Sequence, residues 1–195
     1  QLYMETIEHL DHVLEELLEM LNRAKMLEDT VIIVTADHGE QFGEHGALGH
    51  PHMLYNEQLR VPLIIYNYDH EGVINTNVQH IDIPPTIAKL AGVSYEGFQG
   101  ASLFKIAESK ELCEREILSF ADYNFTHVSM IKGNWKYIYN NGVEELYNLS
   151  EDPYEKRNLI DDHSDVAQIL RHALMSSLQS LSREARRIKY LKNKI

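Results

Sequence analysis

The segment TVIIVTADHGEQFGEHGALGH, residues 30–50, concentrates side chains that could do chemistry. A β-branched and apolar run is followed at once by three carboxylates and three histidines: Asp37, His38, Glu40, Glu44, His45 and His50. A solvated loop needs no such mixture, whereas a metal site or a phosphoryl or sulfuryl site does. The segment is therefore the first candidate for a functional site.

Asp37 and His38 come directly after the apolar run, which we expect to be a strand. In an open α/β sheet, ligands bind outside the carboxyl ends of the strands. A carboxylate oxygen with an imidazole nitrogen could hold Ca²⁺, Mn²⁺ or Zn²⁺. Neighbouring residues of a strand point to opposite faces, so both can bind one ion only if the strand ends there. The alternative is a loop-capping Asp beside a hydrogen-bonded His.

His50 follows a loop rich in glycine and could return to the same cleft. An imidazole there could protonate a leaving group or stabilise anionic oxygens. We expect Glu40, Glu44 and His45 to hold the loop conformation instead.

The elements that must position these residues follow from periodicity. Apolar residues on one stripe predict a helix over residues 2–27. Continuous apolar runs predict strands at 30–36 and 61–67, buried on both faces, with a short helix near 53–58 between them. Asp82 as N-cap, Pro84 and Pro85 in the first turn, and Gly92 at the end predict a further helix.

From about residue 117 the pattern changes. Alternating residues around Asn140-Asn141-Gly142 predict an antiparallel hairpin, and residues 165–191 read as a final amphipathic helix. The fold class is therefore α/β. We expect two domains, an α/β part at residues 1–115 and a small subdomain at 116–195.

The composition excludes some functions. The 195 residues carry a formal net charge of −12, which argues against a general nucleic-acid-binding surface. The locally basic C-terminal segment fits a solvated helix end. Cys113 is the only cysteine, so no disulfide can form within the chain. We find no apolar run long enough for a membrane span, and therefore expect no membrane segment in the chain.

Five segments resemble, in order, the C-terminal half of sulfatases: TADHGEQFGEHGALGH, LYNEQLRVPLIIY, HIDIPPTIAKLAGV, GASLF and KGNWKYIYNNGVEELYNLSEDPYEKRNL. Sulfatases belong to the alkaline phosphatase superfamily. The resemblance implies part of an alkaline-phosphatase-like sandwich, with a mostly parallel sheet flanked by helices and a small C-terminal antiparallel sheet with a helix.

The resemblance also implies roles for particular residues. Asp37 and His38 match the pair that binds the active-site divalent metal, with Ca²⁺ expected first and Mn²⁺ or Zn²⁺ as alternatives. His50 matches the Lys or His that contacts the transferring group or its leaving oxygen. The substrate would be a sulfate or phosphate ester of a small molecule or glycan.

The family's nucleophile motif, C/S-x-P-x-R, is not in this sequence. Cys113 stands in LCEREI, with no proline, and we interpret it as structural. We expect a C-terminal fragment whose partner is the N-terminal half of the same protein, where a formylglycine would be the nucleophile. We expect the fragment alone to be inactive, and it could form a homodimer.

Two other functions remain open. The parent protein could be a phosphoester or phosphonate hydrolase, or a phosphoethanolamine transferase, of the same superfamily. Alternatively, the chain could be a non-catalytic acidic interaction module, although such a module has no need for Asp37, His38 and His50 on one loop.

Overall fold

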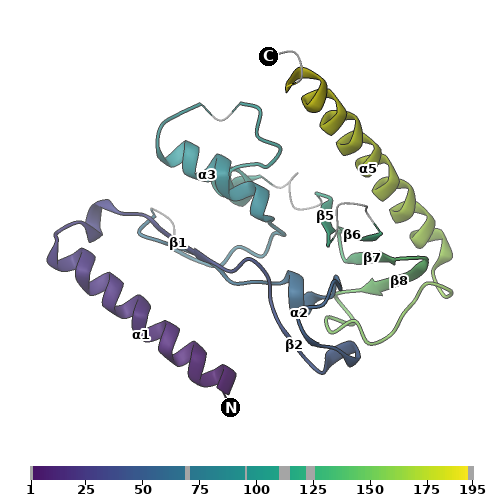
Figure 1. The fold of residues 1–195 in the computed structure, drawn as a ribbon, viewed down its shortest axis with the longest axis horizontal. Helices are drawn as coiled ribbons and strands as arrows, with labels where there is room; N and C mark the ends of the chain where they lie inside the picture. Colours follow the sequence, from purple (N-terminus) through teal and green to yellow (C-terminus); the bar gives the residue numbers. More distant parts are fainter. Residues whose placement is uncertain (1, 69–70, 95, 110–114, 122–125, 193–195) are drawn as a thin grey trace. The chain divides into compact units, whose positions relative to one another are not determined.

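The computed structural model describes residues 2–68, 71–94, 96–109, 115–121 and 126–192, with side chains through residue 183. These residues form two compact units that alternate along the chain (Figure 1). Unit 1 contains residues 1–37 and 61–73, and unit 2 contains residues 38–60 and 74–195. Among the described residues, no helix is both long and apolar enough to cross a membrane. The domain division at residue 115 stays a prediction.

Unit 1 consists of helices and one strand pair. Helix α1 (Leu2–Arg23) ends four residues before the predicted limit, and the 3₁₀-helix η1 (Leu27–Asp29) follows. Strands β1 (Ile32–Thr35) and β4 (Leu63–Tyr66) pair antiparallel. The side-chain amide of Asn67 donates to the carbonyl oxygens of Leu27, Glu28 and Thr30, which ties the end of β4 to the start of β1.

Two expectations about these strands differ from the structure. Residues 32–34 of β1 are half-buried, because among the described residues β1 pairs with a single strand. Every strand pair of the described residues is antiparallel, so the expected parallel pairing is not among them. The connection between β1 and β4 is long enough for parallel or antiparallel pairing, so its length does not predict which of the two forms.

The first segment of unit 2, residues 38–60, is called the site loop below. It contains strands β2 (Gln41–Phe42) and β3 (Leu48–Gly49), which pair antiparallel around the 3₁₀-helix η2 (Glu44–Gly46). Helix α2 (Asn56–Leu59) lies where a short helix was predicted.

The middle of unit 2 is organised by a buried carboxylate. It contains η3 (His80–Asp82), α3 (Ile83–Leu90) and α4 (Leu103–Glu108). Asp82 is the N-cap residue of α3, as predicted, but its carboxylate makes no capping hydrogen bond to that helix. Instead it accepts hydrogen bonds from the backbone N–H groups of Gln79 and Ala101 and from both Nη atoms of Arg115, the last two at 2.9 Å. Asp82 therefore joins three segments.

The C-terminal part is a small antiparallel sheet with a helix, as predicted. Strands β5 (Ile117–Phe120), β6 (His127–Lys132), β7 (Trp135–Asn140) and β8 (Val143–Asn148) are ordered β5-β6-β7-β8. Asn141 and Gly142 form the predicted turn, with φ of 46° and 97°, the left-handed values that a two-residue hairpin turn requires.

Helix α5 (Ser164–Lys192) lies along this sheet (Figure 1). Its residues Ala167, Leu170, Leu174 and Leu178 recur at helical spacing and face the sheet. With them a core forms from buried residues of β6, β7 and β8: Val128, Met130, Tyr137 and Leu146.

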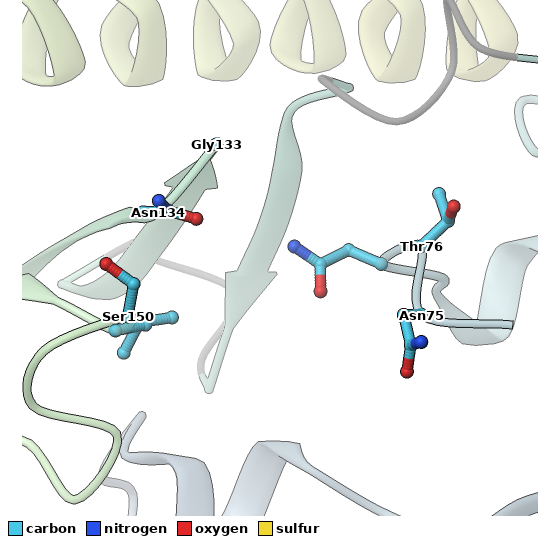
Figure 2. A pocket seen from close by; sticks show the side chains of 7 residues that line it. Asn75, Thr76, Gly133, Asn134 and Ser150 are labelled. Atoms are coloured by element: carbon cyan, nitrogen blue, oxygen red, sulfur yellow. The ribbon is translucent and has the colours of Figure 1, made fainter.

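A polar hollow lies on the surface of unit 2. It has a volume of about 610 Å³ and is bordered by Asn75, Thr76 and Asn77 on one side. Gly133, Asn134, Leu149 and Ser150 border the other side (Figure 2). The lining carries no charged side chain and none of the predicted site residues.

The core contact of α5 can be tested by truncation. Leu174 is fully buried, so Leu174→Ala should lower the free energy of unfolding by about 2–5 kcal/mol, through lost burial and the cavity left behind. Ile169 lies on the same helix with 61% of its surface exposed, so Ile169→Ala should change stability by less than about 1 kcal/mol. Urea denaturation of both variants checks this, and equal losses would contradict the described packing.

Candidate functional site

Asp37 and His38 lie just beyond the end of β1. The strand ends at Thr35, and both residues are exposed. Asp37 is the last residue of the first segment of unit 1, and His38 is the first residue of unit 2. The strand has therefore ended before the pair, as a shared ion would require, and the metal site itself stays a prediction.

The ring of His38 is held in a defined tautomer. Its Nδ1 lies 2.9 Å from the carbonyl oxygen of Gly39. A carbonyl oxygen can only accept, so Nδ1 carries the proton and, in the neutral ring, Nε2 carries the lone pair. Metal-binding histidines are normally oriented in this way, by a hydrogen bond from one ring nitrogen.

His50 follows β3 and lies beside His38. The two ring centroids are 4.6 Å apart, with the ring planes inclined by 33°. Nδ1 of His50 is 3.5 Å from a carboxylate oxygen of Glu40, and the His50 side chain is 63% exposed. The site loop thus brings together two imidazoles that are twelve positions apart in sequence.

Glycine at position 39 is required by a close approach. The Gly39 N–H donates to the carbonyl oxygen of Gln58 at 2.8 Å. A Cβ atom at Gly39 would lie 2.0 Å from the carbonyl oxygen of Glu57. The contact with α2 is the constraint at this position, since φ of Gly39 is not in the left-handed region that favours glycine.

A buried ion pair lies next to α2. Nζ of Lys136, on β7, is 2.5 Å from Oε1 of Glu155, and both side chains are fully buried. Burial lowers the pKa of Lys136 and raises that of Glu155, and the attraction between the two charges offsets both shifts. Removing one partner of such a pair costs about 3–5 kcal/mol, because the other charge is left buried alone.

Asn56 connects this pair to the site loop. Its backbone N–H donates to Oε2 of Glu155 at 2.6 Å, and its side-chain oxygen accepts from Nζ of Lys136 at 3.0 Å. Asn56 therefore donates to the carboxylate of the pair and accepts from its ammonium group.

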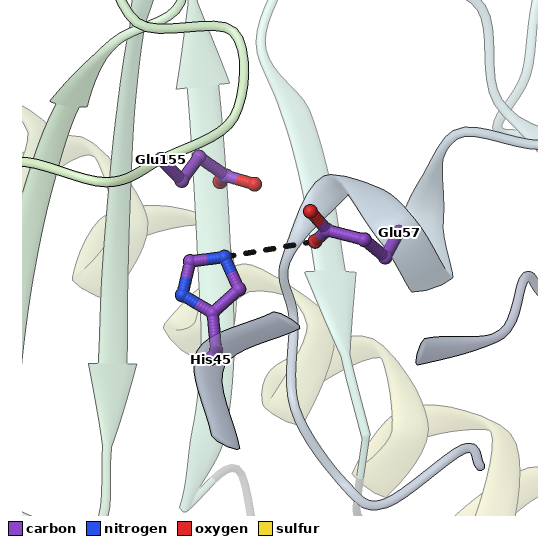
Figure 3. Close-up of side chains that lie close together, drawn as sticks. All are labelled: His45, Glu57 and Glu155. Carbon is purple, nitrogen blue, oxygen red and sulfur yellow. Dashed lines mark ion pairs between the residues drawn. The ribbon is translucent and has the colours of Figure 1, made fainter. Parts of the chain in front are cut away.

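His45, Glu57 and Glu155 converge from three segments (Figure 3). One ligand atom from each lies within 4.8 Å of the others, a spacing that a metal ion could bridge. His45 Nε2 is 3.7 Å from Glu57, and the His45 ring stacks on Tyr55 at 3.6 Å. The ammonium of Lys136 already neutralises Glu155, so we interpret the group as a polar cluster and not as a metal centre.

Two tyrosines add a further connection between the site loop and the sheet. The hydroxyls of Tyr55 and Tyr147 both donate to Oε2 of Glu145, at 2.8 and 2.6 Å. Burial, followed by the neighbouring carboxylate, raises the pKa of both hydroxyls, so they stay protonated donors at neutral pH. Leu54 of the site loop forms a buried apolar cluster with Ile138 and Tyr147, and Tyr55 packs against this cluster.

Four residues of this cluster were not predicted from the sequence: Asn56, Glu57, Lys136 and Glu155. Asn56 and Glu155 are 99 positions apart, so no spacing pattern could pair them. The available signal was the resemblance to sulfatases, because one quoted segment contains Asn56 and Glu57 and another contains Lys136 and Glu155. Of the remaining predictions, that for Cys113 lies outside the described residues.

Comparison with known proteins gives the family. The family model "Sulfatase" matches residues 1–93. A choline-sulfatase of Rhizobium meliloti is 33% identical over 168 residues, which make up 82% of this chain and 33% of the relative. The chain belongs to the sulfatase family. It spans about a third of the length of the curated sulfatase relatives that it matches first.

Solved structures agree with this assignment. A structure in complex with its substrate D-glucosamine-2-N,6-O-disulfate aligns with a TM-score of 0.72 at 25% identity, covering 89% of this chain and 39% of that one. A phosphonate monoester hydrolase of Agrobacterium radiobacter aligns with a TM-score of 0.73 at 23% identity, covering 87% and 39%, and supports the fold alone. The predicted alkaline-phosphatase-like fold is confirmed, and sulfatases are in general metal-dependent.

The close approach at Gly39 can be tested within the site loop. Gly39→Ala should destabilise the protein markedly. The new methyl group would collide with the backbone carbonyl of Glu57, which cannot move aside as a flexible side chain could. Gly43→Ala is the control: nothing lies within 4 Å of its Cβ position, and only the left-handed φ of 118° is unfavourable. Urea denaturation should give a clearly larger loss for Gly39→Ala, and a larger loss for Gly43→Ala would contradict the contact.

Proposed function

We propose that the chain contributes part of the active site of a metal-dependent sulfatase that hydrolyses sulfate esters. One observation carries the proposal: the ring of His38, oriented by a hydrogen bond from Nδ1, lies with its centroid 4.6 Å from that of His50. The comparisons support it, because relatives at 33% and 27% identity are named choline-sulfatase and arylsulfatase.

Asp37 and His38 would hold the divalent metal. Their carboxylate oxygen and imidazole nitrogen suit Ca²⁺, Mn²⁺ or Zn²⁺, with Ca²⁺ our first expectation. The ion would supply Lewis-acid stabilisation of the anionic ester oxygens. The hydrogen bond from Nδ1 to the carbonyl oxygen of Gly39 orients the His38 ring.

His50 would donate a proton to the departing alcohol oxygen, with its imidazole in the protonated form. The Glu40 carboxylate lies 3.5 Å from Nδ1 of His50 and would orient its ring. The Nε2–H then remains to reach the leaving group. His38 and His50 would thus take different roles on one loop, a metal ligand and a general acid.

The nucleophile would come from a part of the protein outside these 195 residues. No C/S-x-P-x-R segment occurs in the printed sequence. We propose a formylglycine there, in an N-terminal part that would also complete the metal site. The substrate would be a sulfated small molecule or glycan, and a sulfated glucosamine is the substrate in one similar structure.

The site residues can be separated by substitution in the full-length natural protein. Asp37→Ala and His38→Ala should weaken Mn²⁺ binding by at least about tenfold, measured by titration calorimetry. His50→Ala should leave Mn²⁺ binding intact and lower kcat for 4-nitrophenyl sulfate by about 10²–10⁴-fold, through loss of the general acid.

His52→Ala is the matched control for the two histidine variants. His52 lies on the same loop, and its ring is 6.5 Å from that of His127. It should alter neither binding nor turnover. Unchanged Mn²⁺ affinity in Asp37→Ala and His38→Ala would contradict the metal assignment, and faster turnover of a phosphonate monoester than of the sulfate would point to the sister reaction.

A further inference from the structure

Helix α2 connects two parts of unit 2 through three consecutive residues. Asn56 binds the buried pair Lys136–Glu155. Glu57 faces His45, in the middle of the site loop. The carbonyl oxygen of Gln58 accepts from the N–H of Gly39, next to His38.

The Gln58 side chain extends this connection. Its Nε2 donates to Oε1 of Gln41 at 2.7 Å, and both side chains are buried. Gln41 in turn donates to the carbonyl oxygen of Glu44 and pairs in β2 with Gly49, the residue before His50. Contacts of α2 therefore reach the neighbours of both histidines.

The other end of the connection is rigid. Lys136 lies within the central strand β7, paired to β6 and β8, and both members of the buried pair have no exposed side-chain surface. Charge-assisted hydrogen bonds are shorter and stronger than neutral ones, and the bond from Asn56 N–H to Glu155, at 2.6 Å, is of this kind.

We propose that Lys136 and Glu155 are positioning residues, which fix His38 and His50 in their mutual geometry through α2. This inference rests on the proposed function for its catalytic meaning. The mechanical part stands by itself: the pair sets the conformation of residues 39–50 even though it touches neither histidine.

The test compares two carboxylates in the full-length natural protein. Glu155→Gln removes the charge that holds Asn56. Asp82→Asn makes the same chemical change at another fully buried carboxylate of unit 2, whose described partners lie at residues 79, 101 and 115, outside the site loop. Both variants should lower the melting temperature.

Only Glu155→Gln should loosen the site loop. Hydrogen–deuterium exchange of peptides covering residues 39–60 should accelerate at least about tenfold in Glu155→Gln and stay near the wild-type rate in Asp82→Asn. At matched folded fraction, kcat for 4-nitrophenyl sulfate should fall in Glu155→Gln more than in Asp82→Asn, with KM less affected.

A double variant separates positioning from stability. Lys136→Met with Glu155→Leu replaces the ion pair by apolar groups, a change that often restores stability in buried pairs. It leaves Asn56 without its partners, so exchange in residues 39–60 should stay fast even where the melting temperature recovers. If the melting temperature of the double variant recovers and exchange in residues 39–60 returns to the wild-type rate as well, the proposal is overturned.

The two proposals fail in different ways. Exchange is read without substrate or metal, so a protein that hydrolyses no sulfate ester still tests the positioning inference. If Glu155→Gln and Asp82→Asn change exchange in residues 39–60 equally, Lys136 and Glu155 are merely structural, whatever the activity.

Discussion

The burial of two opposite charges at Lys136 and Glu155 is the constraint on which much of unit 2 depends. Burying either charge alone would cost much free energy, so the two charges are buried as a pair. Asn56 supplies a further hydrogen bond to each of them. This dependence recruits α2 to the sheet. Through Asn56, Glu155 and Lys136 are thereby joined to a loop that lies 99 and 80 positions earlier in the sequence.

The same site loop is attached to the sheet by contacts of other kinds. Leu54 contributes apolar burial, and Tyr55 contributes a hydroxyl to Glu145. Leu54 thus contributes apolar packing, Tyr55 a hydrogen bond from its hydroxyl, and Asn56 hydrogen bonds to the two buried charges. Because the three interactions differ in their response to salt and pH, no single change of solvent removes them all.

The sequence predicted the elements whose signals are local. The turn at Asn141-Gly142 was predictable because few residues other than Asn and Gly accept left-handed φ, and α3 because two prolines suit a first helical turn. The approach of His50 to His38 was also expected from the loop between them. Buried Lys136 was not, since an isolated lysine in an alternating strand normally faces solvent. Its burial depends on Glu155 and Asn56, which lie far away in sequence.

The interleaving of the units has a consequence for how the protein is made. Asn56 can meet Glu155 only after a further 99 positions have been translated. Until then Asn56, Tyr55 and Leu54 have no sheet to join. At typical rates of about 5–20 residues per second, the segment carrying His38 and His50 waits several seconds or more in an unanchored state. The loop that carries His38 and His50 can therefore complete its contacts with the sheet only after residue 155 has been made.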